Sequence, residues 1–207
     1  MPTAYREKQH RAGRFIILAV CASAVLCAAQ NGDDLREVTT SGKVENNTYS
    51  NSHAGFRLVL PQPPCDPKLN TSVDAGKGYA ILLNCTHVVK GWQGMYTFTI
   101  TLDYREKYPS LQNIEQYVRS LRHSGERLSG EKTVQTEEAR HMAGLDFVQA
   151  ILSEQLPEGG LIYQGIACTQ LRGYLLCFEA EAPSVDSAKA LLNLDDKLQL
   201  NTKQSTK

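Results

Sequence analysis

The sequence has no hydrophobic run long enough to span a membrane as a helix. Its longest apolar stretch, Phe15 to Ala29, holds 15 residues, whereas a membrane-spanning helix needs about 20. Four basic residues precede this stretch, and the chain turns polar from Gln30 onward. A basic start followed by a short apolar segment is typical of a cleaved secretory signal peptide, here residues 1–29. We therefore expect an extracytoplasmic protein, secreted or periplasmic, with no stable membrane span after cleavage.

Lipid anchoring is the alternative to free secretion. A lipoprotein signal needs a small residue just before the cysteine that is lipidated. Cys21 follows Val20 and Cys27 follows Leu26, so neither cysteine fits this requirement well. The sequence favours cleavage, and a need for detergent to release the protein would indicate an anchor instead.

An excess of positive charge is also missing once the leader is removed. The whole chain carries 22 basic and 22 acidic side chains. The leader contains four of the basic residues and one of the acidic ones, which leaves 18 positive and 21 negative side chains, a formal charge of −3. Such a chain has no basic excess to neutralise phosphates. We therefore expect no nucleic-acid partner, but a protein or small molecule of unknown identity.

The mature segment lacks the short motifs that mark common catalytic and metal sites. It contains no HExxH or CxxC spacing and no GxSxG turn. The Gly-Lys-Gly of residues 76–78 lacks the other residues of a phosphate loop. One weak metal candidate combines His87 with Asp103 and Glu106, and requires their strands to be neighbours. We predict no catalytic residue, metal ligand or cofactor. The alternative is a small secreted hydrolase or metal-dependent enzyme whose site is assembled from residues distant in the sequence.

Four cysteines remain after cleavage, and an even number in an oxidising compartment predicts two disulfides. A two-residue turn at residues 172–173 would place Cys168 opposite Cys177 across a hairpin, with their side chains close together. Cys65 would then pair with Cys85 by elimination. Buried free thiols are the alternative, and mass spectrometry with and without reductant distinguishes the two.

Alternating apolar residues, and one short continuous apolar run at 80–85, predict six β-strands. In the clearest, residues 96–102, four large apolar side chains share one face and three threonines share the other, which predicts a wetter surface on the threonine side. Apolar stripes at helical spacing predict one helix from an N-cap at Ser110 to just before Gly125, and another after Ser184. The other strands are expected at 56–60, 80–85, 145–152, 161–168 and 174–180.

The order of these elements is strands, helix, a meander of three strands and a second helix. Helices that each bury one stripe on a largely antiparallel β-sheet form an α+β fold. We expect one such domain over residues 48–200, preceded by a flexible linker at 30–47 that is polar and without periodicity. The proline-rich segment 61–78 is expected to be irregular, and 201–207 to be a disordered tail.

Two segments give the chain a resemblance to a known family. The stretch Tyr49–Pro61 has the pattern Y-x-N-x-x-x-G-F-x-x-x-x-P, and it resembles the first strand of PsbP-like domains. Residues 172–178, followed by Ala-Pro-Ser at 182–184, resemble their final strand and closing helix. The helix expected over Leu111–Leu121 falls where the family has its central helix. The likeness covers roughly residues 49–200 and is one of layout.

The resemblance implies an α/β/α layered domain, the fold of photosystem II extrinsic proteins and of a Ran-binding nuclear import protein. It implies a non-catalytic binding or assembly-accessory role in a bacterial secreted member of that family. The secretory leader excludes the Ran-binding role, and no ligand or metal residue carries over because no such motif matches. The chain departs from the family at Gln62, where a Trp often follows the proline, and in its cysteines.

Trp92 is the only tryptophan, and it lies in the sequence Lys-Gly-Trp-Gln-Gly. The flanking glycines leave it room to project from the surface. It can either cap the core or contact a partner, since exposed aromatic side chains anchor interfaces. Trp92 is therefore a candidate partner contact.

Overall fold

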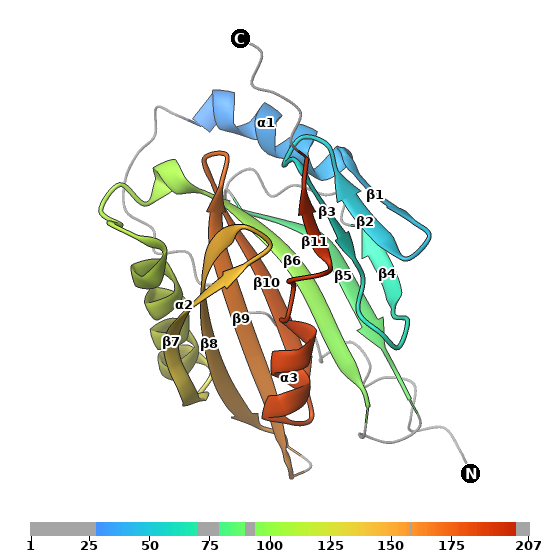
Figure 1. Ribbon diagram of the computed structural model, residues 1–207. Coiled ribbons are helices and arrows are strands. Elements are labelled where there is room, and N and C mark those ends of the chain that lie inside the picture. Colours follow the sequence, from blue (N-terminus) through green and yellow to red (C-terminus); the bar gives the residue numbers. More distant parts are fainter. Residues whose placement is uncertain (1–27, 70–78, 90–93, 158, 202–207) are drawn as a thin grey trace, which may run out of the picture.

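The computed structural model describes residues 28–69, 79–89, 94–157 and 159–201. They form two antiparallel β-sheets and three α-helices, which confirms the expected α+β class. Figure 1 shows the smaller sheet lying over part of the larger one, with α1 crossing one end of both. Among the described residues, no helix is both long enough and apolar enough to cross a membrane.

The larger sheet has seven strands in the order β4-β5-β6-β10-β9-β8-β7. Strands β8 to β10 form the expected meander of three strands, and β7, which was not expected, pairs with β8 and extends it. Strand β10 then pairs with β6, which lies far from it in the sequence. The strands are β4 (Asp66–Leu69), β5 (Tyr79–His87), β6 (Tyr96–Tyr104), β7 (Lys132–Met142), β8 (Leu145–Gln155), β9 (Leu161–Leu171) and β10 (Tyr174–Ala182).

The smaller sheet has the order β1-β2-β3-β11. Its last strand comes from the end of the domain and pairs with β3, so the two ends of the described chain meet in one sheet. The strands are β1 (Gly42–Glu45), β2 (Thr48–Asn51), β3 (Phe56–Val59) and β11 (Leu198–Leu200). The helices are α1 (Ala28–Thr40), α2 (Ile114–Leu128) and α3 (Val185–Leu191), with a short 3-10 helix η1 at Arg105–Lys107.

The main hydrophobic core lies between the two sheets. Phe56 on β3 contacts Phe178 on β10 edge to face, with ring centroids 6.2 Å apart. The even-numbered residues of β6, such as Phe98 and Ile100, point into this core. Helices α1 and α3 close it. The N-cap of α3 is Ser184, whose side-chain oxygen accepts a hydrogen bond from the Ser187 backbone N–H.

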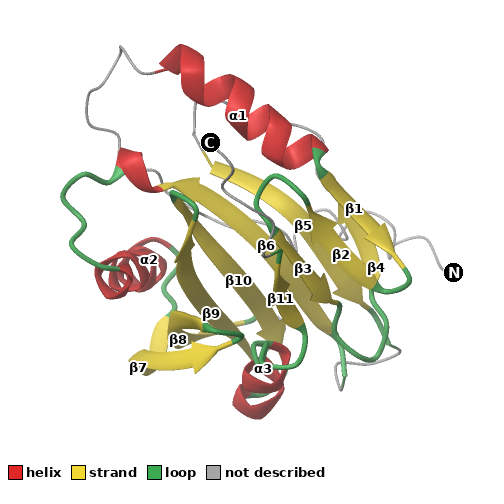
Figure 2. Ribbon diagram, turned by 45° about the horizontal axis from the view of Figure 1, so that its top comes forward, coloured by secondary structure: helices red, strands yellow, loops and turns green. Residues whose placement is uncertain are grey.

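Helix α2 covers the opposite face of the larger sheet. Its apolar residues Tyr117 and Val118 pack on Val148 and Ala150 of β8 and on Cys168 of β9 in a second, separate core. In Figure 2, α2 lies on the side of β7, β8 and β9, away from the smaller sheet. The two faces of the larger sheet are therefore covered by different layers.

The predicted boundaries of α2 are wrong at both ends. Asn113, not Ser110, is the N-cap, because its side chain accepts the Gln116 backbone N–H at 3.0 Å. The helix also continues past Gly125 to Leu128. A Cβ at Gly125 would lie 2.0 Å from the Glu131 carboxyl, so this glycine allows a close approach and does not end the helix.

Residues 30–47 differ from the flexible linker that their composition suggests. They contain most of α1 and all of β1. Leu35 and Val38 of α1 are fully buried in the main core. Two apolar side chains one turn apart are too few to show a periodic stripe in the sequence.

Candidate functional site

The structure forms both predicted disulfides. Cys168 and Cys177 lie directly opposite each other on β9 and β10, with Cα atoms 4.1 Å apart, in the register that the turn at 172–173 predicts. Cys65 is bonded to Cys85 on β5, with Cα atoms 5.4 Å apart. Cys168, Cys177 and Cys85 are buried, so these bonds support the core and are not exposed reactive groups.

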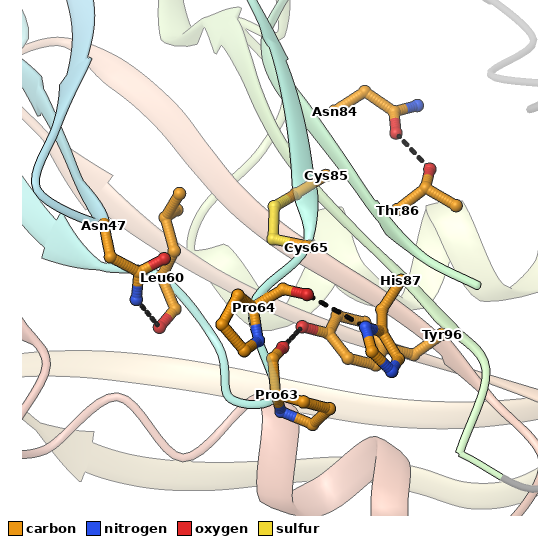
Figure 3. The surroundings of a disulfide bond; sticks show 10 residues. All are labelled: Asn47, Leu60, Pro63, Pro64, Cys65, Asn84, Cys85, Thr86, His87 and Tyr96. Carbon is orange, nitrogen blue, oxygen red and sulfur yellow. Dashed lines mark hydrogen bonds between the residues drawn. A yellow bond between two sulfur atoms is a disulfide. The ribbon is translucent and has the colours of Figure 1, made fainter. Parts of the chain in front are cut away.

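Figure 3 shows that the Cys65–Cys85 bond holds the proline-rich segment against β5. On the same segment, the Pro64 carbonyl lies 2.9 Å from Nδ1 of His87, and the Pro63 carbonyl accepts the Tyr96 hydroxyl. The rings of His87 and Tyr96 stack with centroids 5.2 Å apart. His87 therefore has a structural role here.

The weak metal candidate that combined His87 with Asp103 and Glu106 is wrong. His87 pairs with Tyr96 at one end of β6, whereas Asp103 lies seven residues further along that strand, a separation of roughly 20 Å. Among the described residues, no three His, Cys, Asp or Glu side chains are grouped so that they could hold a metal ion. Trp92 and residues 76–78 lie outside the described residues.

A cluster of polar side chains joins α1 to the larger sheet. Oδ2 of Asp34 accepts hydrogen bonds from the hydroxyls of Tyr104 at 2.7 Å and Tyr174 at 2.5 Å, and its Oδ1 lies 2.7 Å from Nε2 of His53. Burial acts to raise the pKa of Asp34, but hydrogen bonds from Tyr174, Tyr104 and His53 outweigh it and hold the pKa below its usual value. The cluster is an anchor for α1.

A second set of polar residues lies on the α2 face of the larger sheet, across β6 and β10. It consists of Thr97, Thr99 and Thr101 with Glu179 and Glu181, and we call these five residues the polar strip. Thr97 lies opposite Glu181 and Thr99 opposite Glu179. The Thr97 hydroxyl bonds Glu181 at 2.8 Å, and the Thr101 hydroxyl bonds Glu179 at 3.0 Å.

Thr99 is exceptional within the polar strip. It is 1% exposed, yet its hydroxyl is one of two buried side-chain polar atoms in the described part of the chain that have no hydrogen-bond partner. The expectation of a wetter surface on this face is therefore wrong for Thr99 and for Thr101, which is also buried. A buried hydroxyl without a partner costs about 1–3 kcal/mol, so such groups call for an explanation.

The carboxyl groups of the polar strip are strongly perturbed. Burial and the nearby carboxyls of Glu181 and Glu131 raise the pKa of Glu179 to about 7, against an opposing effect of Thr101. The pKa of Glu131, beside the strip, is also raised to about 7, by burial and by Glu154 and Glu181. Burial raises the pKa of Glu181 too, with a contribution from Glu154. Within the described residues, no cationic group opposes these shifts.

Asp103, two residues beyond Thr101 on the same face, provides a contrast. Its Oδ2 accepts the hydroxyls of Tyr108 at 2.7 Å and Tyr117 at 2.8 Å. Burial raises its pKa, while these two tyrosines and the positive charge of Lys107 oppose the rise. Its Oδ1 is the second buried atom without a partner. Asp103 thus has a cation nearby, which the strip carboxyls lack among the described residues.

The polar strip is not among the sites expected from the sequence. One signal for it exists: Glu179 and Glu181 alternate with Phe178 and Ala180 in a strand that is otherwise apolar. The hydroxyls that bind these glutamates come from β6, about 80 residues away in the chain. Chemically, the strip offers hydrogen-bond acceptors and titratable carboxyls at a partly buried surface.

Comparison with known proteins identifies the fold. No protein-family model matches the sequence, and no curated protein matches it. The solution structure of cyanobacterial PsbP (CyanoP) from Synechocystis sp. PCC 6803 is similar with a TM-score of 0.52 and 12% sequence identity, over 74% of this chain and 91% of that chain. A crystal structure of PA94 from Pseudomonas aeruginosa, a protein of unknown function, has a TM-score of 0.41 and 14% identity, over 70% and 83%. The first likeness confirms the PsbP-like fold.

Proposed function

We propose that this chain, which has the PsbP fold, is an extracytoplasmic binding or assembly-accessory protein without catalytic activity. The observation that carries the binding role is the polar strip, where a buried hydroxyl without a partner lies among carboxyls that repel one another. Both features raise the free energy of the unliganded protein. A cationic ligand that also supplies the missing hydrogen bond would relieve both at once.

Two disulfides support the extracytoplasmic location. Such bonds form and persist in oxidising compartments and are rare in the cytosol of most organisms. Here both bonds include core cysteines, since Cys85 and Cys168 are fully buried. The leader of residues 1–29 supports the same location, and cleavage before Gln30 is part of the proposal.

The location is tested on protein purified from its native host. We expect mass spectrometry to find a chain that starts at Gln30 and has four cysteines resistant to alkylation until reductant is added. An intact leader together with four reactive thiols would overturn the extracytoplasmic assignment. The expression host must be the native one, because a foreign host imposes its own redox conditions.

A hydrolase is the second candidate function, because the pKa of Glu179 and of Glu131 is near the value that general acid–base catalysis requires at neutral pH. Against it, one oxygen of Glu179 is held by Thr101. Turnover of glycoside or ester substrates by the purified protein, abolished in Glu179→Gln and retained in Glu138→Gln on the exposed edge of β7, would replace the binding proposal. Stoichiometric metal in native protein would favour the metal-dependent version.

A further inference from the structure

We propose that the polar strip binds the primary ammonium group of a small organic amine. This inference deepens the proposed binding function and rests on it. It stands on two independent observations: two carboxyls, of Glu179 and Glu181, on one face of β10, and the Thr99 hydroxyl on the adjacent strand β6, which is almost fully buried on the same face and has no partner.

The hydrogen bonds already made define which acceptors are left. Thr101 occupies Oε1 of Glu179, and Thr97 occupies Oε2 of Glu181. The described residues supply no hydrogen bond to the other carboxyl oxygen of either glutamate. The hydroxyl of Thr99, directly opposite Glu179, is the third acceptor. An ammonium group carries three N–H donors and no acceptor, so its donors match these three groups in number and kind.

The charge of the surroundings favours a cation over a neutral polar ligand. The carboxyls in and beside the strip repel one another, and this repulsion contributes to the raised pKa of Glu131, Glu179 and Glu181. Glu154 takes part in it through Glu131 and Glu181. One positive charge among them turns this repulsion into attraction, and the gain is largest where the carboxyls are withdrawn from water. A polyol would fill the acceptors but leave the repulsion in place.

The donor groups favour an ammonium ion over a metal ion, because the described residues group no three side chains suited to hold a metal. On the face of the polar strip, Ile81 of β5 lies opposite Thr101, and Ile166 of β9 lies opposite Glu179. These apolar side chains flank the buried end of the strip and withdraw it from water. The side chains beside the other end are polar, with Asn84 opposite Thr99 and Thr86 opposite Thr97 on β5.

Exposure along the strip indicates where the ligand enters. Thr97 and Glu181 are partly exposed, and Thr99 and Glu179 are buried, while Glu154, outside the strip on β8, is exposed. The ammonium group would therefore reach the buried end, and the alkyl chain would extend toward the side of Thr97 and Glu181.

The test is calorimetric titration of the mature protein, residues 30–207, with propylammonium chloride at constant ionic strength. Tetramethylammonium chloride controls for charge without N–H donors, potassium chloride for a simple cation and glycerol for a neutral polyol. We expect saturable binding of propylammonium and about tenfold weaker binding of each control, because a hydrogen bond to a charged group is worth roughly that factor or more.

Three variants assign the site. Glu179→Gln and Glu181→Gln should each weaken propylammonium binding about tenfold, and Thr99→Val should weaken it severalfold. Because the Thr99 hydroxyl has no partner to lose, Thr99→Val should fold normally, so its loss of binding would not reflect unfolding. Glu138→Gln, an exposed glutamate on β7, is the matched control and should bind like the wild type.

Equal binding of propylammonium and tetramethylammonium would overturn the inference, as would undiminished binding in both glutamine variants or tighter binding of glycerol. These results would leave the extracytoplasmic part of the proposed function standing, because the leader and the disulfides are tested separately. Conversely, a cytosolic protein with reduced cysteines that still bound propylammonium through Thr99 would overturn the location and leave the ammonium site intact.

Discussion

Thr99 and Glu179 lie directly opposite each other on β6 and β10, yet no hydrogen bond joins them. The neighbouring threonines on either side each donate to a glutamate of β10, so Thr99 is the one member of its row left without a partner. The buried Thr99 hydroxyl without a partner therefore lowers the stability of the unliganded protein. This cost can be measured as a change in the free energy of unfolding.

Thr99→Val should leave the free energy of unfolding unchanged or raise it by about 1 kcal/mol, since an isosteric methyl group replaces a hydroxyl that gains nothing from burial. Thr101→Val on the same strand is the matched control. It removes the donor to buried Glu179 and should lower stability by about 1–3 kcal/mol. Urea unfolding monitored by circular dichroism compares the two. A larger loss in Thr99→Val than in Thr101→Val would show that the Thr99 hydroxyl has a partner.

Stability should fall as pH rises toward neutrality, and Glu179 should cause part of the fall. Its pKa is about 7 in the folded protein, against an ordinary value of 4.5, so the folded state binds a proton that the unfolded chain releases. The stabilisation is complete below about pH 4.5 and is lost as the pH rises through 7, up to roughly 3 kcal/mol. The charges that raise the pKa of Glu179 are those of Glu181 and Glu131. The charge of Glu179 in turn raises the pKa of Tyr117 on α2.

Urea unfolding at several pH values between about 5 and 8 measures this dependence. Glu179→Gln should flatten the curve, and Glu138→Gln should not. Asp34 does not interfere, because its pKa is lowered and its contribution is lost only as the pH falls below this range. An unchanged slope in Glu179→Gln would contradict the assignment of a raised pKa to this residue.

The sequence predicts the centre of the larger sheet well. Arg172 and Gly173 both have positive φ, at 51° and 85°, which is the geometry of a tight hairpin turn. That turn fixes the register of β9 and β10 residue by residue, and with it the Cys168–Cys177 bond. Local turn chemistry suffices here because the partners are close in the chain.

Elements whose stabilisation comes from distant residues are not predicted. Helix α1 is polar, and hydrogen bonds from the hydroxyls of Tyr104 and Tyr174 to Asp34 hold it. These tyrosines are far from α1 in the sequence and lie beside it only in the folded chain. Strand β7 has no apolar face from which the sequence could predict it. It is held in part by an ion pair of 2.7 Å between Glu137 and Arg122 of α2. The polar strip is missed for the same reason, since its halves come from separate parts of the sequence.

The two disulfides should contribute unequally to stability. Loss of a disulfide releases a loop in the unfolded chain, and the cost grows with loop length. Cys65 and Cys85 are 20 residues apart and Cys168 and Cys177 only nine, so the double variant Cys65→Ala/Cys85→Ala should lose more stability. We expect about 3 kcal/mol for the longer loop and somewhat less for the shorter. Thermal unfolding of both double variants measures the order, and the reverse order would show that packing beneath α2 outweighs loop length.

Asp34→Asn should release α1 from the rest of the domain. The amide has nearly the same size but no charge, so it weakens the hydrogen bonds from Tyr104 and Tyr174 and removes the ion pair that Asp34 can form with His53. We expect a loss of about 1–3 kcal/mol in the stability of the helix. Hydrogen exchange of the amides of residues 34–40 should accelerate while that of β9 and β10 stays slow, because helix docking can fail without global unfolding. Asp146→Asn, at an exposed aspartate that pairs with His141, is the control and should leave exchange in α1 unchanged. If Asp34→Asn also left it unchanged, the apolar contacts of Leu35 and Val38 alone would be holding the helix in place.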